Sequence, residues 1–331
     1  MILLLGSKDD AFTSYVAEWL SYLNQDYIVF LGEEDIKVLS FNRQESKLRI
    51  KYYDREIDLF EVDSVLSRRS GLKTINYTTS NKIPNLSIEV SDLSIFHVNQ
   101  EALKMTEYIH FLLQRNCKKI IGGFSHNMVN KLIVLEYAKE IGLDIPIYSV
   151  LSTKSELYKF YIDARSKEQN IITKPMAEGV YAFSENFGYY SYVERVKEKD
   201  FKTIPDKFFP SFFQVEIKKK YEVRVFYLNG KCYSMAILSQ DSVYTETDFR
   251  KPILNNHINR KVPYILPKFI EDKIGLLMDK MLLNTGSLDL IVSSDDKYYF
   301  LEINPVGQIL MTSVPCNYYL DKKVALSLIN N

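Results

Sequence analysis

The sequence predicts an α/β protein with a parallel N-terminal sheet and a polar hairpin near the C-terminus. Residues 1–30 read as strand, helix and strand, because apolar runs at Met1–Leu5 and Tyr27–Leu31 flank a helix-periodic segment at Ala11–Leu23. A βαβ start of this kind is typical of a parallel sheet. Near the other end, Gly286–Gly307 reads as two short strands joined by a polar turn. The length of 331 residues is enough for two or three domains.

Composition excludes several classes of protein. Lys plus Arg and Asp plus Glu both number 42, which argues against a general nucleic-acid or membrane-surface binder but allows a local basic pocket. The three cysteines have no metal-ligand or redox spacing, and an odd number fits no closed disulfide framework. The apolar start lacks a basic leader, and no later segment is long enough to span a bilayer. We therefore expect a soluble protein of the cytoplasm.

The N-terminal part continues with a meander and a strand that leads into two arginines. Lys47–Tyr53 and Glu56–Phe60 alternate in polarity, and a strand from Val62 then runs into Arg68 and Arg69. Arginines at the C-terminal end of a sheet strand can contact an anionic ligand, and the alternative is a solvated pair in a loop.

Residues 72–93 read as a polar loop. An amphipathic helix at 101–115 then closes the first domain, with four residues on its apolar side: Leu103, Tyr108, Phe111 and Leu112.

The middle of the chain contains a lysine at the end of a strand. A short strand at 119–123, a helix at 127–141, a strand at 143–150 and a helix at 155–165 are expected before it. The β-branched run from Asn170 then leads to Lys174, directly before a proline. A lysine in an apolar strand needs an anion for its ammonium group, unless the side chain snorkels to water. Residues 180–206 lack clear periodicity, and we expect a mobile lid there.

Strands dominate the next segment. A strand at 210–218 precedes a hairpin at 221–239, whose Asn229-Gly230 dipeptide favours a type I′ turn. Glu222 and Arg224 share one face of this hairpin, where Arg224 could contact an anion or form a cross-strand salt bridge. We expect a polar loop at 240–263 and helices at 267–283 and 320–329.

The C-terminal hairpin brings oxygen donors together. With the turn centred between Asp295 and Asp296, Asp289 lies opposite Glu302, and Asn304 follows on the same face. The core face carries Leu288, Leu290, Val292, Tyr299, Leu301 and Ile303. Facing carboxylates repel unless a cation lies between them, and all-oxygen ligands suit Mg²⁺. The alternative is a surface hairpin with scattered acids. Four scattered histidines support neither a metal site nor a catalytic triad.

The order of these signals resembles the ATP-grasp superfamily over residues 116–331. The matching segments run from Lys131 and Lys174 through Phe213–Ile217, Glu222–Val225, Asp248–Arg250 and Asp289 to Leu301–Pro305. Within that superfamily the chain looks most like the graspetide (microviridin-type) peptide maturases. The residues that narrow the resemblance to this group are Ser64–Arg69, Ser239-Gln240 before Asp248–Arg250, and Phe300–Gln308. The resemblance implies an ATP-grasp fold with an N-terminal pre-ATP-grasp domain (1–115), a central domain with a lid (116–208) and a C-terminal ATP- and Mg²⁺-binding domain (209–331).

The resemblance also implies roles for single residues. Lys131 and Lys174 would hold the ATP phosphates. Gln214, Val215, Glu216 and Ile217 would meet adenine through backbone groups and the Gln214 or Glu216 side chain, with Glu222 near the ribose. Arg224 and Arg250 would face the γ-phosphate and the acyl phosphate, and Asp289, Glu302 and Asn304 would hold Mg²⁺. Arg68 and Arg69 would help to position an acidic peptide substrate.

The sequence departs from the family pattern at two places. Leu66 stands where an aromatic residue often precedes the arginine pair, so peptide recognition can differ. The loop after Lys174 has a single glycine, Gly179, in place of a glycine-rich run. The resemblance therefore does not assign the contacts of this loop with phosphate.

The implied activity is that of an ADP-forming ligase that acts on a ribosomally made precursor peptide with leader and core parts. It would convert Asp or Glu side chains to acyl phosphates and close ester (Thr or Ser) or amide (Lys) macrocycles, with no nucleic-acid or membrane partner and with homodimers common in the family. One alternative is an ATP-grasp ligase that adds amino acids to a protein C-terminus or a small acid, as ribosomal-protein glutamate ligases do. Another is a non-catalytic ATP-binding or peptide-binding module.

Overall fold

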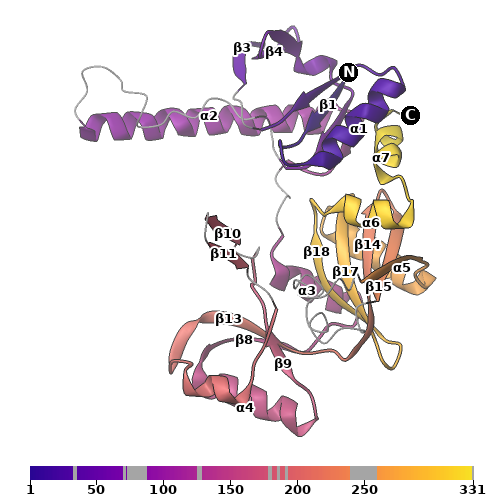
Figure 1. Cartoon of the computed structure of the whole chain (residues 1–331). Helices are drawn as coiled ribbons and strands as arrows, with labels where there is room; N and C mark the ends of the chain where they lie inside the picture. The colour runs from indigo at the N-terminus through magenta and orange to yellow at the C-terminus, as the bar shows by residue number, and fades with distance from the viewer. Residues whose placement is uncertain are drawn as a thin grey trace. The chain divides into compact units, whose positions relative to one another are not determined.

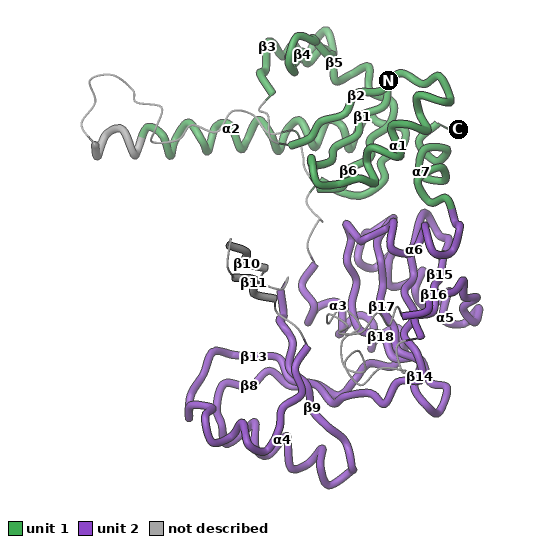
Figure 2. Tube along the Cα trace, in the orientation of Figure 1, with its two compact units in different colours: residues 1–127, 319–331 green, residues 128–318 purple. Residues whose placement is uncertain are grey.

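A computed structural model describes residues 1–32, 36–69, 72, 88–124, 129–177, 181–184, 187–190, 193–238 and 259–329. It confirms the α/β fold class, with helices and strands in both of two compact units (Figure 1). Unit 1 comprises residues 1–127 and 319–331, and unit 2 comprises residues 128–318 (Figure 2). The three-domain division expected from the sequence stays a prediction.

Unit 1 is centred on a four-stranded parallel sheet in the order β2-β1-β6-β7. Its strands are β1 (Ile2–Leu5), β2 (Tyr27–Phe30), β6 (Ser64–Ser67) and β7 (Lys119–Ile121). Its helices are α1 (Ala11–Tyr22), α2 (Ile88–Asn116) and α7 (Leu320–Ile329). All residues of β1 and β6 are buried, as is typical of parallel strands with both faces covered. The predicted βαβ start and the strand that leads into Arg68 are confirmed.

The C-terminal helix α7 belongs to unit 1, although it follows the whole of unit 2 in sequence (Figure 2). The Ser64 hydroxyl of β6 donates to the Leu328 carbonyl of α7 at 2.8 Å. The indole N–H of Trp19 in α1 donates to Asp321 Oδ2 at 2.7 Å. Helix α7 therefore completes the N-terminal sheet layer.

Helix α2 is longer than the sequence predicts and buries a different stripe. It spans Ile88–Asn116, so the expected loop is wrong from residue 88 onward, and residues 73–87 lie outside the described chain. Leu112 is buried as predicted, but Leu103 and Phe111 are 46% and 53% exposed. The reason is that α2 packs on the core of unit 1 through a stripe that includes Ile109, Leu112 and Leu113, and neither Leu103 nor Phe111 belongs to that stripe.

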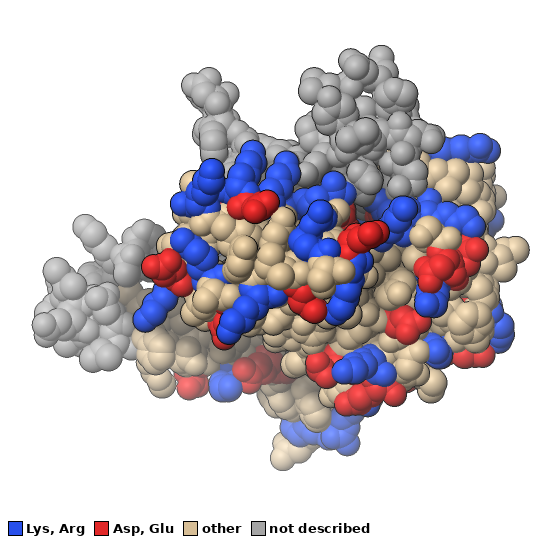
Figure 3. Space-filling model, turned by 90° about the horizontal axis from the view of Figure 1, so that it is seen from below, with Lys and Arg blue, Asp and Glu red and all other residues tan. Residues whose placement is uncertain are grey.

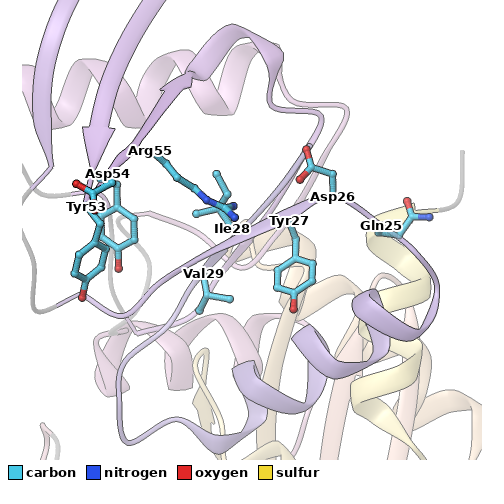
Figure 4. Close-up of a pocket in the computed structure, with 9 residues that line it drawn as sticks. Gln25, Asp26, Tyr27, Ile28, Val29, Tyr53, Asp54 and Arg55 are labelled. Atoms are coloured by element: carbon cyan, nitrogen blue, oxygen red, sulfur yellow. The ribbon is translucent and has the colours of Figure 1, made fainter.

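A small antiparallel sheet in the order β3-β4-β5 completes unit 1. Its strands are β3 (Lys37–Asn42), β4 (Lys47–Tyr52) and β5 (Arg55–Asp58), followed by the short 3-10 helix η1 (Leu59–Glu61). A pocket of about 670 Å³ lies between β2 and the turn that joins β4 to β5 (Figure 4). It contains none of the predicted site residues.

Unit 2 contains a five-stranded antiparallel sheet in the order β16-β15-β14-β17-β18. Its strands are β14 (Lys219–Leu228), β15 (Lys231–Leu238), β16 (Arg260–Tyr264), β17 (Thr285–Ser293) and β18 (Tyr298–Asn304). Helices α3 (Lys131–Glu140) and α5 (Lys268–Lys280) cover one face and form with it the large core of the unit. The predicted turn at Asn229-Gly230 is confirmed, since both residues have the positive φ of a type I′ turn.

The second sheet of unit 2 has the order β12-β9-β13-β8. Its strands are β8 (Tyr148–Thr153), β9 (Ile171–Thr173), β12 (Glu194–Arg195) and β13 (Lys207–Val215), and α4 (Lys154–Ser166) packs on one face. The expected strand at 143–150 begins only at Tyr148. The segment expected to be a lid contains the two-stranded hairpin β10 (Tyr181–Ser184) and β11 (Phe187–Tyr190), then β12 and the 3-10 helix η2 (Glu198–Lys202). The lid function stays a prediction.

Two further segments differ from the sequence prediction. The loop expected at 240–263 ends in β16, which pairs with β15, whereas residues 239–258 lie outside the described chain. Helix α6 (Ile309–Cys316) was not predicted, because Pro315 near its end obscures the helical pattern. Asn317 ends α6 in a left-handed conformation.

The β17–β18 hairpin contains a bulge that changes its predicted faces. Asp289 pairs with Glu302 as predicted, but Leu290 pairs with Phe300, so β18 has one extra residue at Leu301. Beyond the bulge, Phe300 is the fully buried residue of β18. The predicted core face is therefore wrong at two positions, which are only half-buried: Tyr299 and Leu301.

The described surface mixes charges of both signs. Lys and Arg side chains are interspersed with Asp and Glu side chains over the face drawn in Figure 3. Across the described ranges, no helix is both long enough and apolar enough to cross a bilayer.

Candidate functional site

Three charged side chains lie in one row across the five-stranded sheet of unit 2. Arg224 of β14 pairs with Asp289 of β17, and Asp289 pairs with Glu302 of β18. Side chains of directly paired residues project to the same face. The adjacent Val223 and Leu288 belong to the core on the other face, so the row lies on the face away from α3 and α5. The pairing that the sequence predicts for Asp289 and Glu302 is confirmed.

Each carboxylate of this row faces a cation. Glu302 Oε2 lies 3.1 Å from Lys131 Nζ, and Asp289 Oδ1 lies 3.4 Å from Arg224 Nε. The Lys131 and Arg224 side chains are 13% and 8% exposed, whereas those of Asp289 and Glu302 are 28% and 40% exposed. The two cations therefore offset the repulsion between the two carboxylates, and the carboxylates stay accessible to a ligand.

Lys131 links three parts of the site. The Asn130 side chain accepts hydrogen bonds from the N–H groups of Leu132 and Ile133, so α3 begins at Lys131 rather than at residue 127. Lys131 Nζ also donates to the Pro175 carbonyl at 2.9 Å. The same ammonium group thus joins α3, the loop after Lys174 and the Glu302 carboxylate.

Asn304 is held by the loop that follows β18. Its Oδ1 accepts a 2.8 Å hydrogen bond from the Gly307 N–H. Gly307 has a φ of +59°, and a Cβ atom there would lie 2.4 Å from Ser287 Oγ, so only glycine fits this turn. The side-chain amide oxygen Oδ1 of Asn304 therefore has a fixed direction, and one of its lone pairs is left for a ligand.

The oxygen donors of the site suit a hard cation. Two carboxylates and an amide oxygen match the preferences of Mg²⁺. Within the described ranges, no group of three or more His, Cys, Asp or Glu side chains could hold a metal ion. Because they supply three oxygen donors, Asp289, Glu302 and Asn304 fit a Mg²⁺ ion that takes further oxygens from a phosphate ligand, as protein-bound Mg²⁺ usually does.

The second sheet of unit 2 carries Lys174, the other lysine predicted to hold phosphate. Ile171, Phe213 and Val215 pack against α4, so the alternate residues project to the opposite face. There the half-buried Lys174 Nζ lies 5.7 Å from the centre of the Phe212 ring.

Gln214 and Val215 end β13 as buried residues, and the segment 216–218 then connects to β14. Glu216 is held firmly: Arg195 Nε and Nη2 donate to its two carboxylate oxygens at 2.7 Å each. Its N–H group donates to the Asn170 carbonyl at 2.8 Å. Of the two side chains considered for adenine contact, that of Glu216 is thus already occupied by Arg195.

Glu222 forms a close ion pair with Lys219, and their side chains are 15% and 6% exposed. The Glu222 carboxylate lies on the same strand face as Arg224, two residues along β14. A role near a ribose stays a prediction.

The arginine pair of unit 1 is split between two environments. Arg68 is 5% exposed, and its Nε and Nη2 donate to the two Asp10 carboxylate oxygens at 2.7 and 3.1 Å. Burial raises the pKa of Asp10, but the hydrogen bonds and charge of Arg68 outweigh burial and lower that pKa below its usual 3.8. Arg69 is exposed. The peptide-contact roles of both arginines stay predictions, and Asp10 already occupies Arg68.

Several predicted residues lie outside the described chain. They are Gly179, Ser239, Gln240, Asp248 and Arg250.

The sequence did not point to three residues that contact the predicted site residues. Asp10 and Arg195 are the ion-pair partners of Arg68 and Glu216, and Met311 Sδ of α6 accepts a hydrogen bond from Arg224 Nη1 at 2.9 Å. Each contact depends on the tertiary packing of distant segments, which no local pattern reveals.

Comparison with known proteins identifies the fold. No protein-family model matches the sequence, and no curated protein matches it closely enough to be counted as a relative. Among solved structures, the macrocyclase MdnC of Microcystis aeruginosa MRC, bound with precursor peptide MdnA, is 22% identical with a TM-score of 0.74. The match covers 100% of this chain and 99% of MdnC.

Two further structures agree with this match. A RiPP-associated ATP-grasp ligase of Chryseobacterium gregarium, in complex with ADP and a leader and core peptide, is 23% identical with a TM-score of 0.75, over 99% of this chain and 94% of the ligase. The ATP-grasp ligase PsnB, complexed with minimal precursor, Mg and ADP, is 17% identical with a TM-score of 0.71, over 99% and 96% of the two chains. The whole chain therefore has the fold of the ATP-grasp ligases, as the sequence predicts.

Proposed function

We propose that this protein is an ATP-dependent, ADP-forming ligase that closes macrocycles in a ribosomally made precursor peptide. The observation that carries the proposal is the row of Arg224, Asp289 and Glu302, with Lys131 beside it, in a chain that has the fold of ATP-grasp ligases throughout. Similar structures include ligases in complex with ADP and with precursor peptides.

The nucleotide would occupy the space faced by the two sheets of unit 2. Lys131 and Lys174 would hold the phosphates as compact positive charges. Gln214, Val215 and the segment that begins with Glu216 and Ile217 would meet adenine, with Glu222 near the ribose. Asp289, Glu302 and Asn304 would hold Mg²⁺, which, when bound, supplies positive charge to the phosphate oxygens.

In the first chemical step, an Asp or Glu carboxylate of the peptide attacks the γ-phosphorus of ATP. The bond to the β-phosphate oxygen breaks, and the products are an acyl phosphate and ADP. Arg224 and Arg250 would offset the charge that develops on the transferred phosphoryl group. The protein needs no nucleophile of its own, because both reacting groups belong to its substrates.

In the second step, a Thr or Ser hydroxyl or a Lys amine of the same peptide attacks the acyl carbon. An ester or amide bond forms, inorganic phosphate leaves, and the nucleophile loses a proton. Each ring therefore removes one water from the peptide. An acyl phosphate hydrolyses readily, so residues 180–206 would exclude water as a lid.

Further parts of the proposal concern the partners. Leader and core parts of the peptide would both bind, with Arg68 and Arg69 positioning acidic side chains. A homodimer, a cytoplasmic location and the three-domain division at residues 115 and 208 belong to the same proposal.

The experiment uses the full chain, ATP, Mg²⁺ and a precursor peptide encoded by a short reading frame beside the gene. The proposal requires ADP release together with a peptide mass that falls by one water for each bond formed. A mass that rises would indicate the addition of amino acids, which is the alternative ligase activity. Binding of nucleotide without ADP release, for any neighbouring peptide, would indicate a non-catalytic module and overturn the proposal.

A further inference from the structure

The buried side chain of Arg224 has only weak contacts within the described chain. It is 8% exposed, and its one hydrogen bond to a described residue runs from Nη1 to Met311 Sδ at 2.9 Å. Nε lies 3.4 Å from Asp289 Oδ1 and forms no hydrogen bond with any described residue. A guanidinium group has five N–H donors, whereas a thioether sulfur is a weak acceptor. Most of the hydrogen-bonding capacity of Arg224 is therefore unused, which is costly for a buried charge unless a ligand takes it up.

Helix α6 covers the part of the five-stranded sheet where Arg224 lies. Arg224 of β14 pairs with Met235 of β15, so the two side chains share one face. Cys316, at the end of α6, belongs to a small buried cluster with Met235. Shortly after α6, the Tyr318 hydroxyl donates to the Ser234 carbonyl of β15 at 2.6 Å. The C-terminal end of α6 is therefore fixed on the strand next to Arg224.

The N-terminal end of α6 follows the loop that holds Asn304. The turn at Gly307 fixes the direction of the Asn304 amide oxygen, and the helix begins two residues after it. In the first turn of the helix, the Met311 N–H group donates to the Gln308 carbonyl at 3.0 Å. The backbone at Met311 is thus fixed from both ends of α6, and its thioether is held beside the guanidinium group of Arg224.

The kind of acceptor beside Arg224 decides how readily its guanidinium group can bind a phosphate. An oxygen acceptor would hold the group strongly, because hydrogen bonds from a charged donor are the strong ones. A thioether provides a polarisable packing contact and only a weak hydrogen bond, which a phosphoryl oxygen can replace. An apolar side chain of similar size would provide the packing contact alone.

We propose that Met311 is a positioning residue that directs Arg224 into the site and leaves its donors available to the γ-phosphate. This inference rests on the proposed function, in which Arg224 contacts the transferred phosphoryl group. Met311 acts through Arg224 and does not touch the reacting atoms. A stronger acceptor at position 311 would therefore draw the guanidinium group toward α6 and weaken binding of the γ-phosphate. It would leave the binding of ADP, which lacks that phosphate, nearly unchanged.

Isothermal titration calorimetry on the full chain without peptide tests this role. The ligands are Mg·ADP and Mg·AMPPNP, an ATP analogue that retains a γ-phosphate. Met311→Gln has a similar length and a carbonyl oxygen, so it should weaken Mg·AMPPNP binding about tenfold and Mg·ADP binding by less than about twofold. Met311→Leu keeps the size of the side chain but has no acceptor, so its affinity for Mg·AMPPNP should stay within about threefold of wild type.

The matched control is the same substitution on the other face of the sheet. Met281 is half-buried like Met311, but it ends α5, which packs on the face away from Arg224. Met281→Gln should bind both nucleotides as wild type does.

A second pair of variants shows whether the effect passes through Arg224. In an Arg224→Gln background, Met311→Gln has no guanidinium group to hold, so it should not weaken Mg·AMPPNP binding further. A tenfold effect that persists in this background would contradict the positioning role.

The outcomes separate this inference from the proposed function. Wild-type protein that binds neither nucleotide would overturn the proposed function. Wild-type protein that binds both, with Met311→Gln weakening neither or weakening both equally, would overturn only the role of Met311. A loss of Mg·AMPPNP binding in Met311→Leu as large as that in Met311→Gln would assign Met311 to packing alone and would likewise overturn it.

Discussion

Neutralising Glu302 tests the charge balance of the candidate site. In the described site, Lys131 and Arg224 face Glu302 and Asp289 at 3.1 and 3.4 Å, so two cations offset two carboxylates. Glu302→Gln keeps the shape of the side chain and leaves a net charge of about +1 on these four residues. Because Glu302 is 40% exposed, solvent screens the change, and its effect on a bound phosphate is on the order of 1 kcal/mol.

The sign of the effect depends on the metal. Without Mg²⁺, ATP should bind Glu302→Gln about fivefold more tightly than wild type, because the repelling carboxylate is gone. With Mg²⁺, the variant keeps an amide oxygen at this position but loses one of the two carboxylate charges proposed to hold the metal, so turnover should fall about a hundredfold or more. Calorimetric titration with and without chelator measures the first effect, and ADP release against Mg²⁺ concentration measures the second. The free energy of unfolding should change by less than about 1 kcal/mol.

The control for this prediction lies in the same hairpin. Asp296→Asn removes an exposed carboxylate that pairs with Lys220 at 2.7 Å, and asparagine tolerates the φ of +60° at this position. This variant should behave as wild type in both titrations. Equal Mg²⁺ dependence of turnover in wild type and Glu302→Gln would refute the assignment of Glu302 to the metal.

Two further predictions concern the architecture around the site and in unit 1. Gly307→Ala should lower the free energy of unfolding by about 1–3 kcal/mol, because the φ of +59° is strained for alanine and its Cβ would lie 2.4 Å from Ser287 Oγ; urea unfolding followed by circular dichroism measures the loss. Arg68→Met should lower the stability of unit 1 at pH 7 by about 3–5 kcal/mol, because it leaves the buried Asp10 carboxylate without its cation. The lowered pKa of Asp10 stabilises the wild-type fold above the usual value of 3.8, and this contribution is lost as the pH falls through the lowered pKa. The difference between wild type and Arg68→Met should therefore shrink below about pH 4.

Both predictions have internal controls. Gly230→Ala has a φ of +84° but no atom within 4 Å of the new Cβ, so it should cost less than Gly307→Ala. A cost at Gly230 equal to that at Gly307 would show that the close contact with Ser287 is unimportant. For Arg68, the protein has a single tryptophan, Trp19, which lies in α1 of unit 1 and reports on that unit by fluorescence. A wild-type-to-variant difference that stays constant from pH 7 to pH 3 would contradict the role of the Asp10 charge.

The sequence predicted the carboxylate pair through two errors that cancel. Alternation with a turn between Asp295 and Asp296 pairs Asp289 with Glu302. In the structure, the pairs next to the turn are symmetric about Asp295 itself, half a residue from the predicted centre. The extra residue at Leu301 shifts the register again and restores the predicted pairing of Asp289 with Glu302. A single-residue bulge leaves no clear sign in an alternating pattern, so the pairing was predicted and the core face beyond it was not.

Local sequence patterns could not predict two of the ion pairs that hold predicted site residues. Arg195 reaches Glu216 across an intervening strand, and this depends on the sheet order β12-β9-β13. Asp10 and Arg68 are 58 residues apart in sequence and meet because β6 pairs in parallel with β1. Periodicity predicts which elements exist and which faces are apolar, whereas the order of strands in a sheet is decided by the packing of the whole unit.

The ion pairs of the site also predict that metal and nucleotide bind together. The carboxylates proposed for Mg²⁺ are the partners of the cations proposed for phosphate, Glu302 with Lys131 and Asp289 with Arg224. Mg²⁺ alone would have to take carboxylates from these cations, and ATP alone would have to take the cations from their carboxylates. Each ligand releases the groups that the other needs, so each should raise the affinity for the other by the same factor. Mg²⁺ titrations with and without ADP should differ by about tenfold in affinity, and Lys131→Met should reduce that factor by strengthening the binding of Mg²⁺ alone. Equal affinity for Mg²⁺ with and without ADP would show that the ion pairs do not couple the two ligands.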